Sequence, residues 1–245
     1  DNSIPVNTFC QKADFAESSG AHNTGLAVMV DNMLRQLGFK TPPMLADERV
    51  RTTVDGFPIV IFHRETPDSE MTFLGKYNFN NDKSTQETYG LSGEAECWEF
   101  LNNTSDRCLF KSVDFASDEW LKDFEGRFPD GNTDPKNLKA LCEWIASTDN
   151  DPDKFREECE QHFDKNFLLF YYIITEVFAC VDQRAKNMML AFWENKWYPI
   201  FYDNDTINGI NNEGLVAFDY QVEYHDRIGS QNVWNGADSE LWKLV

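Results

Sequence analysis

Residues 167–180 place the strongest constraint on how this chain can fold, because they are apolar on nearly every side. A segment of this length with apolar residues all round predicts a helix buried in the interior. Asp164 stands where its side chain can cap the first turn. Two strand-forming runs, 188–193 and 197–202, then flank Glu194-Asn195-Lys196, a pattern typical of a hairpin. The sequence therefore predicts a buried helix, a loop and a hairpin, in that order.

Four polar residues fall where these elements end. Asn187 follows Asp182 by five residues in the loop, and Asp203 follows Asn187 by sixteen, with Asp205 just beyond. Protein kinases use this layout in their catalytic loop and metal-binding segment. A loop and the end of a hairpin must converge if their oxygen ligands are to share one cation. The spacing alone is a weak signal, and the predicted helix and hairpin strengthen its interpretation as a metal site.

The remaining elements are expected to be strands in the first half of the chain and helices in the second, with a boundary near residues 115–130. In the first half we expect strands over 7–14, 71–79 and 108–113, and a pair of strands within 51–62 around Asp55-Gly56. We also expect a helix through Leu26 to Leu37, closed by Gly38, and a short helix over 94–101. In the second half, Asp134-Pro135 and Asp151-Pro152 predict helices that run to about Ser147 and His162. From Gly209 onward we expect loops, with no element at the C-terminal Leu244-Val245.

These patterns predict an α+β fold with two lobes, like that of protein kinases, although many α+β proteins share this division. We expect a single domain over residues 1–245, with a strand-rich lobe over 1–120 and a helical lobe over 121–245. The numbering is compatible with a fragment of a longer chain.

The formal net charge of −20 argues against a nucleic-acid partner, since binding to phosphate backbones relies on Lys and Arg. Bound divalent cations would have to offset this charge before a nucleotide could bind, and the simplest reason for the charge is solubility. No apolar run approaches the roughly 18 residues of a transmembrane helix, so no membrane partner is expected. No leader is visible either.

Cysteine and histidine usage gives no sign of a structural metal site. The six cysteines include no Cys-x-x-Cys pair, and several, such as Cys142, stand on apolar faces. Buried free thiols are therefore the expectation. The four histidines are scattered without ligand spacing, which argues against zinc.

Several blocks of the sequence resemble a known family. The segment Trp197–Asp205, preceded by Asp182–Asn187 and followed by Gly209, resembles the atypical protein kinases named for the spore-coat protein CotH. Asp55-Gly56-Phe57 and Leu74-Gly75-Lys76-Tyr77 are similar to a second block of that family. Residues 75–83 and 98–103 look like the branch found in tailed-phage structural proteins. The resemblance extends loosely from about residue 8 to 215, and it implies the two-lobed kinase fold.

The resemblance also implies a role for individual residues. Asp182 would be the catalytic loop carboxylate, with Arg184 beside it, and Lys12 would reach the nucleotide phosphates. Each of these has a plainer alternative: Arg184 as a structural ion-pairing residue, and Lys12 as a solvated strand lysine. The other implied roles are Asn187 and Asp203 as metal ligands, Asp205 as their helper and Lys76 as a second nucleotide-binding lysine. Asn187 could instead bond the loop backbone, and Asp205 could cap a turn.

Departures from the kinase pattern bear on catalysis more than on fold. A glycine-rich phosphate loop is missing, Asp203-Asn204-Asp205 stands where Asp-Phe-Gly would be, and Glu17 is only one candidate for the acidic partner of Lys12.

Two functions are therefore compatible with the resemblance. One is an ATP-dependent kinase that uses Mg²⁺ or Mn²⁺ to phosphorylate protein Ser, Thr or Tyr within a phage virion. The other is an inactive kinase-like module that builds a virion or spore coat. Under either function the expected partners are other virion or coat proteins in an oligomeric assembly. The expected location is the virion, assembled in the bacterial cytoplasm, with the spore coat or cytoplasm as alternatives. A Ca²⁺-binding coat domain is a third idea, without an EF-hand pattern to support it.

Overall fold

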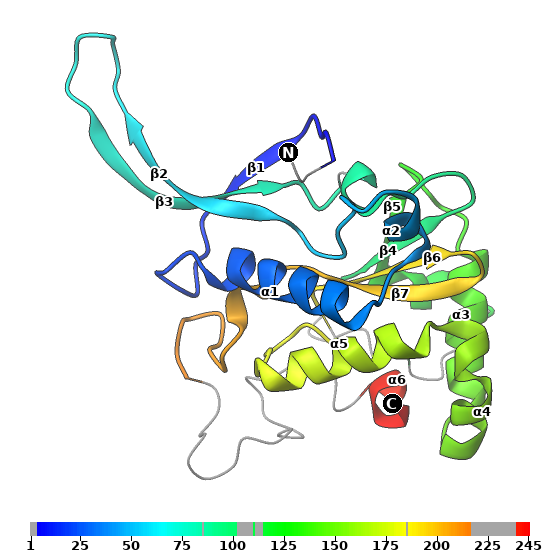
Figure 1. Cartoon of the computed structure of the whole chain (residues 1–245). Coiled ribbons are helices and arrows are strands. Elements are labelled where there is room, and N and C mark those ends of the chain that lie inside the picture. The colour runs from blue at the N-terminus through cyan, green and yellow to red at the C-terminus, as the bar shows by residue number, and fades with distance from the viewer. Residues whose placement is uncertain (1–3, 85, 102–109, 111–114, 185, 217–238) are drawn as a thin grey trace.

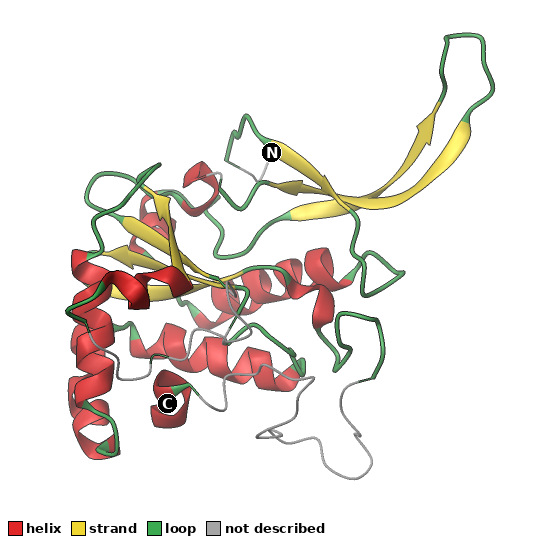
Figure 2. Ribbon diagram, turned by 180° about the vertical axis from the view of Figure 1, so that it is seen from behind, coloured by secondary structure: helices red, strands yellow, loops and turns green. Residues whose placement is uncertain are grey.

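The computed structural model describes residues 4–84, 86–101, 110, 115–184, 186–216 and 239–245. Its elements form two antiparallel sheets and a group of helices. In Figures 1 and 2 the three-stranded sheet lies on one side of the four-stranded sheet, and the helices α3, α4 and α5 lie on the other side. The expected α+β class, with strands toward the N-terminus and helices in the C-terminal half, is confirmed.

The three-stranded sheet has the order β1-β3-β2, with β1 at Phe9–Lys12, β2 at Gly56–His63 and β3 at Thr72–Asn81. β1 pairs only with the last four residues of β3, so the outer parts of β2 and β3 form a two-stranded arm that projects from the body (Figure 1). The strands expected over 7–14 and 71–79 are confirmed.

The expectation of two strands within 51–62 is wrong. A single strand, β2, begins at Gly56, and residues 51–55 form a connection that bridges to β7 through Thr53 and Phe201. Gly56 is therefore not a turn glycine. A Cβ atom there would lie 2.5 Å from the carbonyl oxygen of Phe79 and 2.8 Å from Cα of Asn80, so the neighbouring strand leaves no room for a side chain.

Helix α1, at His22–Leu37, lies between β1 and β2 in the chain, and it confirms the helix expected through Leu26 to Leu37. Leu26, Val30 and Leu34 form its buried stripe. Gly38 closes it in the left-handed conformation, and the Gly38 N–H bonds to the carbonyl of Arg35. The short helix α2, at Pro42–Ala46, begins after Thr41, whose hydroxyl accepts the Met44 N–H at 3.3 Å.

The four-stranded sheet has the order β5-β4-β6-β7, with strands at Phe124–Phe128, Glu96–Phe100, Met188–Trp193 and Lys196–Phe201. The predicted hairpin of β6 and β7 is confirmed, and its turn residues Glu194 and Asn195 both have positive φ. The short helix expected over 94–101 is wrong, because this segment is the inner strand β4. Its burial between β5 and β6 decides its conformation, as packing often overrides local propensity. The sheet thus combines strands from both sides of residue 120.

The helices α3, at Lys136–Ser147, and α4, at Pro152–His162, confirm the two Asp-Pro starts to within a residue. Helix α5, at Lys165–Val177, is capped by Asp164, which accepts the Phe167 N–H at 3.0 Å. The expectation that α5 is buried on every side is wrong for one face, where Ile173 is 54% and Val177 is 68% exposed.

The core has two parts, one on each face of the four-stranded sheet. The larger cluster packs this sheet against the helices, and it includes Tyr171 and Phe201, whose ring centroids lie 4.5 Å apart. The smaller cluster lies on the other face and contains Tyr89, Leu91, Ala95, Cys97, Met189, Ala191 and Ile200. The hairpin of β6 and β7 is therefore packed on both sides, which makes it a rigid support for the residues at its end.

Short elements complete the fold. They are the 3-10 helices η1 at Gln86–Tyr89, η2 at Asp118–Asp123 and η3 at Asn204–Thr206, and the helix α6 at Glu240–Leu244. The expectation of no element at the C-terminal residues is wrong, since Trp242 of α6 stacks on Tyr171 with centroids 5.6 Å apart.

The strand expected over 108–113 lies outside the described residues apart from Phe110. Cys97, Cys142, Cys159 and Cys180 are buried free thiols as expected, whereas the free thiol Cys10 is only half-buried, and Cys108 lies outside the described residues. Within the described parts of the chain, no helix is long and apolar enough to cross a membrane.

Candidate active site

Asp182 lies in the loop that follows α5, and it is held on both sides. The hydroxyl of Thr206 donates to its Oδ1 at 2.9 Å, and the amide of Asn187 donates to its Oδ2 at 3.0 Å. Lys186 places its ammonium 3.8 Å from the same Oδ2. Only 1% of Asp182 is exposed. The loop thus fixes this carboxylate in one orientation beneath the surface.

Burial raises the pKa of Asp182 to about 6, because a charged carboxylate loses its hydration there. Lys186 and the hydrogen bonds from Thr206 and Asn187 lower this pKa, whereas the nearby Asp205 raises it. A carboxylate with a pKa near neutrality can exchange a proton at physiological pH, which is the property a general base requires.

Asp203 lies just after β7 and forms an ion pair with Lys12 of β1. This contact joins the three-stranded sheet to the end of the hairpin. The Gln183 side chain donates to the Asp203 carbonyl at 2.7 Å, so the loop also holds the Asp203 backbone. Asp203 and Asn187 both have left-handed backbone conformations, with φ of 55° and 48°. Such conformations in residues other than glycine gather at functional sites.

Asp205 is bound to α1 through its backbone. His22 Nδ1 donates to the Asp205 carbonyl at 3.0 Å. Burial raises the pKa of the Asp205 carboxyl, and the neighbouring Lys12 lowers it. The structure therefore brings Lys12, Asp182, Asn187, Asp203 and Asp205 to one place, where the loop, the hairpin end and β1 meet.

Arg184 and Lys76 lie differently from these five. Arg184 is buried, forms an ion pair with Glu176, and lies over the ring of Tyr172 at 4.6 Å from its centroid. These contacts connect it to α5, which agrees with the structural alternative for this residue. Lys76 is exposed on β3, and its ammonium lies against Gly20 in the loop between β1 and α1. A Cβ atom added to Gly20 would lie 3.1 Å from this ammonium.

Glu17 does not contact Lys12. Its carboxylate accepts the Ser19 N–H at 2.5 Å and the His22 N–H at 3.2 Å, so it organises the turn that enters α1. Partial burial would raise the pKa of Glu17, but these donors outweigh that effect and lower it. The acidic partner of Lys12 is thus Asp203.

A family model described as CotH kinase protein matches residues 64–242, which is most of the chain. The chain belongs to the CotH kinase protein family. The match includes Asp182, Asn187, Asp203 and Asp205, and it begins after Lys12 and α1. No curated protein matches the chain.

A charged cluster that the sequence did not reveal lies next to Tyr202, the residue before Asp203. Buried Glu99 of β4 pairs with Lys83 at 2.6 Å and with Arg127 of β5 at 2.5 Å. The Lys83 ammonium lies 4.6 Å from the centroid of the Tyr202 ring. The sequence missed this cluster because its pattern predicts a helix over 94–101. Residues alternate between the two faces of a strand, and this alternation places Glu99 on the face where Lys83 and Arg127 lie.

Three asparagines, Asn23, Asn78 and Asn204, are also buried beside the site, and the sequence patterns assigned none of them a role. A buried asparagine needs partners, so each indicates a hydrogen-bond network rather than a solvated surface. Only the position of Asn204 between two acidic residues could have drawn attention to one of them.

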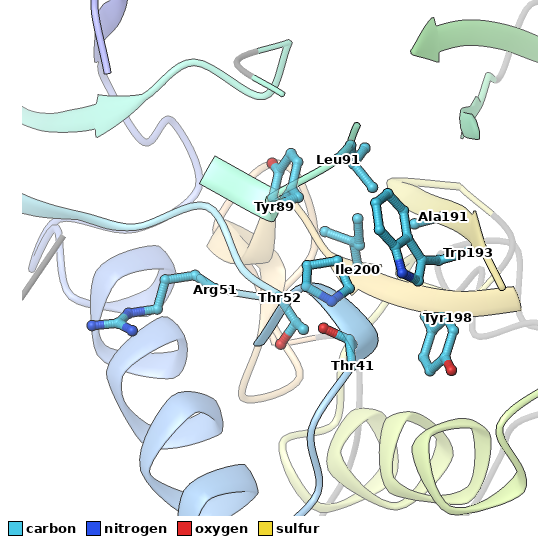
Figure 3. A pocket seen from close by; sticks show the side chains of 10 residues that line it. Thr41, Arg51, Thr52, Tyr89, Leu91, Ala191, Trp193, Tyr198 and Ile200 are labelled. Carbon is cyan, nitrogen blue, oxygen red and sulfur yellow. The ribbon is translucent and has the colours of Figure 1, made fainter. Parts of the chain in front are cut away.

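Two hollows lie near the four-stranded sheet, and neither suits a phosphate group. A pocket of about 310 Å³, including space open to solvent, is lined by apolar and aromatic side chains of β6, β7 and residues 89–91, together with Thr41, Pro43, Arg51 and Thr52 (Figure 3). A larger cleft of about 1030 Å³, also including open solvent, is lined by Asp82, Glu87, Glu125 and Asp130 with Arg127. Its lining is mainly acidic, which disfavours phosphate groups there.

The donor set at the hairpin end fits a hard divalent cation. Carboxylate and amide oxygens are the ligands that Mg²⁺ and Mn²⁺ prefer. Among the described residues, however, no three His, Cys, Asp or Glu side chains are already arranged as a metal site. The Lys12 ammonium is paired with the Asp203 carboxylate, so a cation would bind this carboxylate only after Lys12 has moved away from it.

Proposed function

We propose that this CotH-family domain is an ATP-dependent kinase that transfers the terminal phosphoryl group to a protein Ser, Thr or Tyr hydroxyl, with Mg²⁺ or Mn²⁺. The observation that carries the proposal is the convergence of Lys12, Asp203 and the buried Asp182 at one point. Phosphoryl transfer relies mainly on positioning and charge neutralisation, and a lysine beside fixed carboxylates supports the proposal on both counts.

Each residue has a defined task in this proposal. Lys12 exchanges Asp203 for the nucleotide phosphates, which frees the Asp203 carboxylate to bind the cation. Asn187 and Asp205 supply further oxygen ligands, and Asp182 receives the proton of the acceptor hydroxyl. The divalent cation, when bound, neutralises charge on the phosphates. Because Asp182 is buried, the acceptor reaches it only after the loop or the neighbouring lobe shifts.

The test is calorimetry of ATP binding with Mg²⁺ to the wild type and to Asp203→Asn. We expect the variant to lose metal-dependent binding, because an amide is a weaker cation ligand and a weaker partner for Lys12. Asp153→Asn on α4, whose side chain is highly exposed, is the matched control and should bind as the wild type does. Equal binding by the wild type and Asp203→Asn would refute the assignment of the site.

The second candidate is a kinase-like structural module of a phage virion, in the tail or neck, or of a spore coat. The observation that favours it is the projecting arm of β2 and β3, which exposes Val60, Phe62, Phe73 and Leu74. Apolar side chains on a projecting arm are suited to contact other coat proteins in an oligomeric assembly.

Phe62 and Phe73 pack edge-on in the arm, with centroids 5.5 Å apart, and both rings are exposed. The double variant Phe62→Ser/Phe73→Ser should abolish co-purification with assembled particles and leave ATP binding unchanged. Particles that incorporate this variant normally would remove the support for the structural candidate.

A further inference from the structure

A small hydrogen-bond network connects the metal-binding segment to the rest of the protein. Asn23, in the first turn of α1, is its centre. The Asn23 side chain donates to Asp14 Oδ1 at 2.9 Å and accepts the backbone N–H of Asn204 at 2.5 Å. Asn78 of β3 donates to the other oxygen of Asp14, also at 2.5 Å. Four separate segments of the chain thus meet at two side chains.

This network adjoins the ion pair of Lys12 and Asp203 on both sides. Asp14 follows Lys12 by two residues, and Asn78 is the residue opposite Lys12 in the pairing of β1 with β3. At the other end, Asn204 directly follows Asp203, and its N–H is the group that Asn23 accepts. The same contacts therefore hold residues close to Lys12 and the residue that follows Asp203.

Burial gives these contacts their weight. Asn23, Asn78 and Asn204 are nearly inaccessible to solvent, so a lost partner leaves a polar group unpaired away from water. The carboxylate of Asp14 accepts one amide N–H on each of its two oxygens, and these two hydrogen bonds fix its orientation.

We propose that Asn23, held by Asp14, is a positioning residue for the metal-binding segment 203–205. This inference rests on the proposed function, because it concerns how the same site holds its cation. Asn23 fixes the Asn204 N–H and thereby the left-handed backbone of Asp203. It links metal affinity to the packing of α1 and β1 against the end of the hairpin.

A reciprocal exchange of the two side chains tests the proposal. Asn23→Asp still accepts the Asn204 N–H, but it loses the donor to Asp14 and places two carboxylates together. In the double variant Asn23→Asp/Asp14→Asn, the new amide at position 14 can donate to the new carboxylate at position 23 and still accept from Asn78, so every hydrogen bond is restored. The affinity for Mn²⁺ alone is measured from the electron paramagnetic resonance signal of the free ion, and Mg²⁺-dependent ATP binding is measured by calorimetry.

We expect Asn23→Asp to weaken Mn²⁺ binding by about tenfold or more, as the disruption of a buried polar contact implies, and the exchange to restore most of the loss. The added negative charge by itself would strengthen cation binding, so a loss cannot arise from charge. Asn23→Ala, which removes both contacts without adding charge, should also lose affinity.

Asn137→Asp is the matched control, because Asn137 on α3 also donates to a carboxylate, that of Glu96, at 2.5 Å. It should lower thermal stability and leave Mn²⁺ binding unchanged. If the wild type binds Mn²⁺ and Asn23→Asp binds it equally well, the inference is wrong while the proposed function stands. A wild type that binds neither Mn²⁺ nor ATP overturns the proposed function itself, and the inference with it.

Discussion

At the scale of single residues, Asp182 makes the stability of the protein depend on pH. Its pKa of about 6 exceeds the value of roughly 3.9 in an unfolded chain, so the folded state binds its proton more tightly. The stabilisation from the protonated form is complete below about pH 4, and it is lost as pH rises through about 6. Above that pH, without metal, the buried charge destabilises the fold.

Asp182→Asn should remove this loss. In the presence of a chelator we expect the variant to be more stable than the wild type by about 1–3 kcal/mol at pH 7.5, and by much less at pH 4.5. Urea unfolding at the two pH values measures the difference. A stability difference that stays the same at both values would contradict the raised pKa.

The sequence predicted which of the candidate residues lie close together better than it predicted their contacts. The spacing of Asp182, Asn187 and Asp203 with the hairpin predicted that they converge, because a loop and a strand end adjoin in any such hairpin. It could not show that Asp203 pairs with Lys12, since that contact joins residues almost two hundred positions apart. Nor could it show Asn23, whose amide has no spacing pattern.

At the scale of elements, caps and turns were predictable and the inner strands were not. Asp151, Asp164 and Gly38 act through local backbone geometry, which the neighbouring residues determine. β4 is a strand because it lies between β5 and β6, and β6 in particular is far away in the sequence. Local propensity has no information about that pairing.

The sequence predicted a turn at Gly56, but in the structure Gly56 begins β2 and lies directly against the backbone of β3. We expect Gly56→Ala to destabilise the protein by about 1–3 kcal/mol, because the new Cβ would strike the backbone of β3. Gly25→Ala is the control, since no atom beyond the neighbouring backbone of α1 lies within 4 Å of its Cβ position. It should be neutral or stabilise by up to about 1 kcal/mol. Thermal unfolding of both variants measures this, and a neutral Gly56→Ala would contradict the crossing.

At the scale of the whole molecule, the site is where the two sheets meet. The first sheet contributes Lys12, and the second contributes Asp203 at the end of β7. The sequence predicted two parts that differ in secondary structure. It did not predict that β4 and β5 join β6 and β7 in one sheet, because register between distant strands is set by packing. The ion pair therefore reports on how the two sheets are placed relative to each other.

Lys12 should affect metal binding and nucleotide binding in opposite directions. Its ammonium competes with a cation for Asp203, so Lys12→Met should strengthen Mn²⁺ binding by about threefold to tenfold, in line with a partly exposed ion pair. The same variant lacks the group that meets the phosphates, so Mg²⁺-dependent ATP binding should weaken by at least about tenfold. Lys136→Met on α3, which removes an exposed lysine far along the chain, should change neither. If Lys12→Met weakened the binding of Mn²⁺ and of ATP equally, Lys12 would hold the two sheets together rather than exchange partners. In that case the substitution would also lower the thermal unfolding temperature well below that of Lys136→Met.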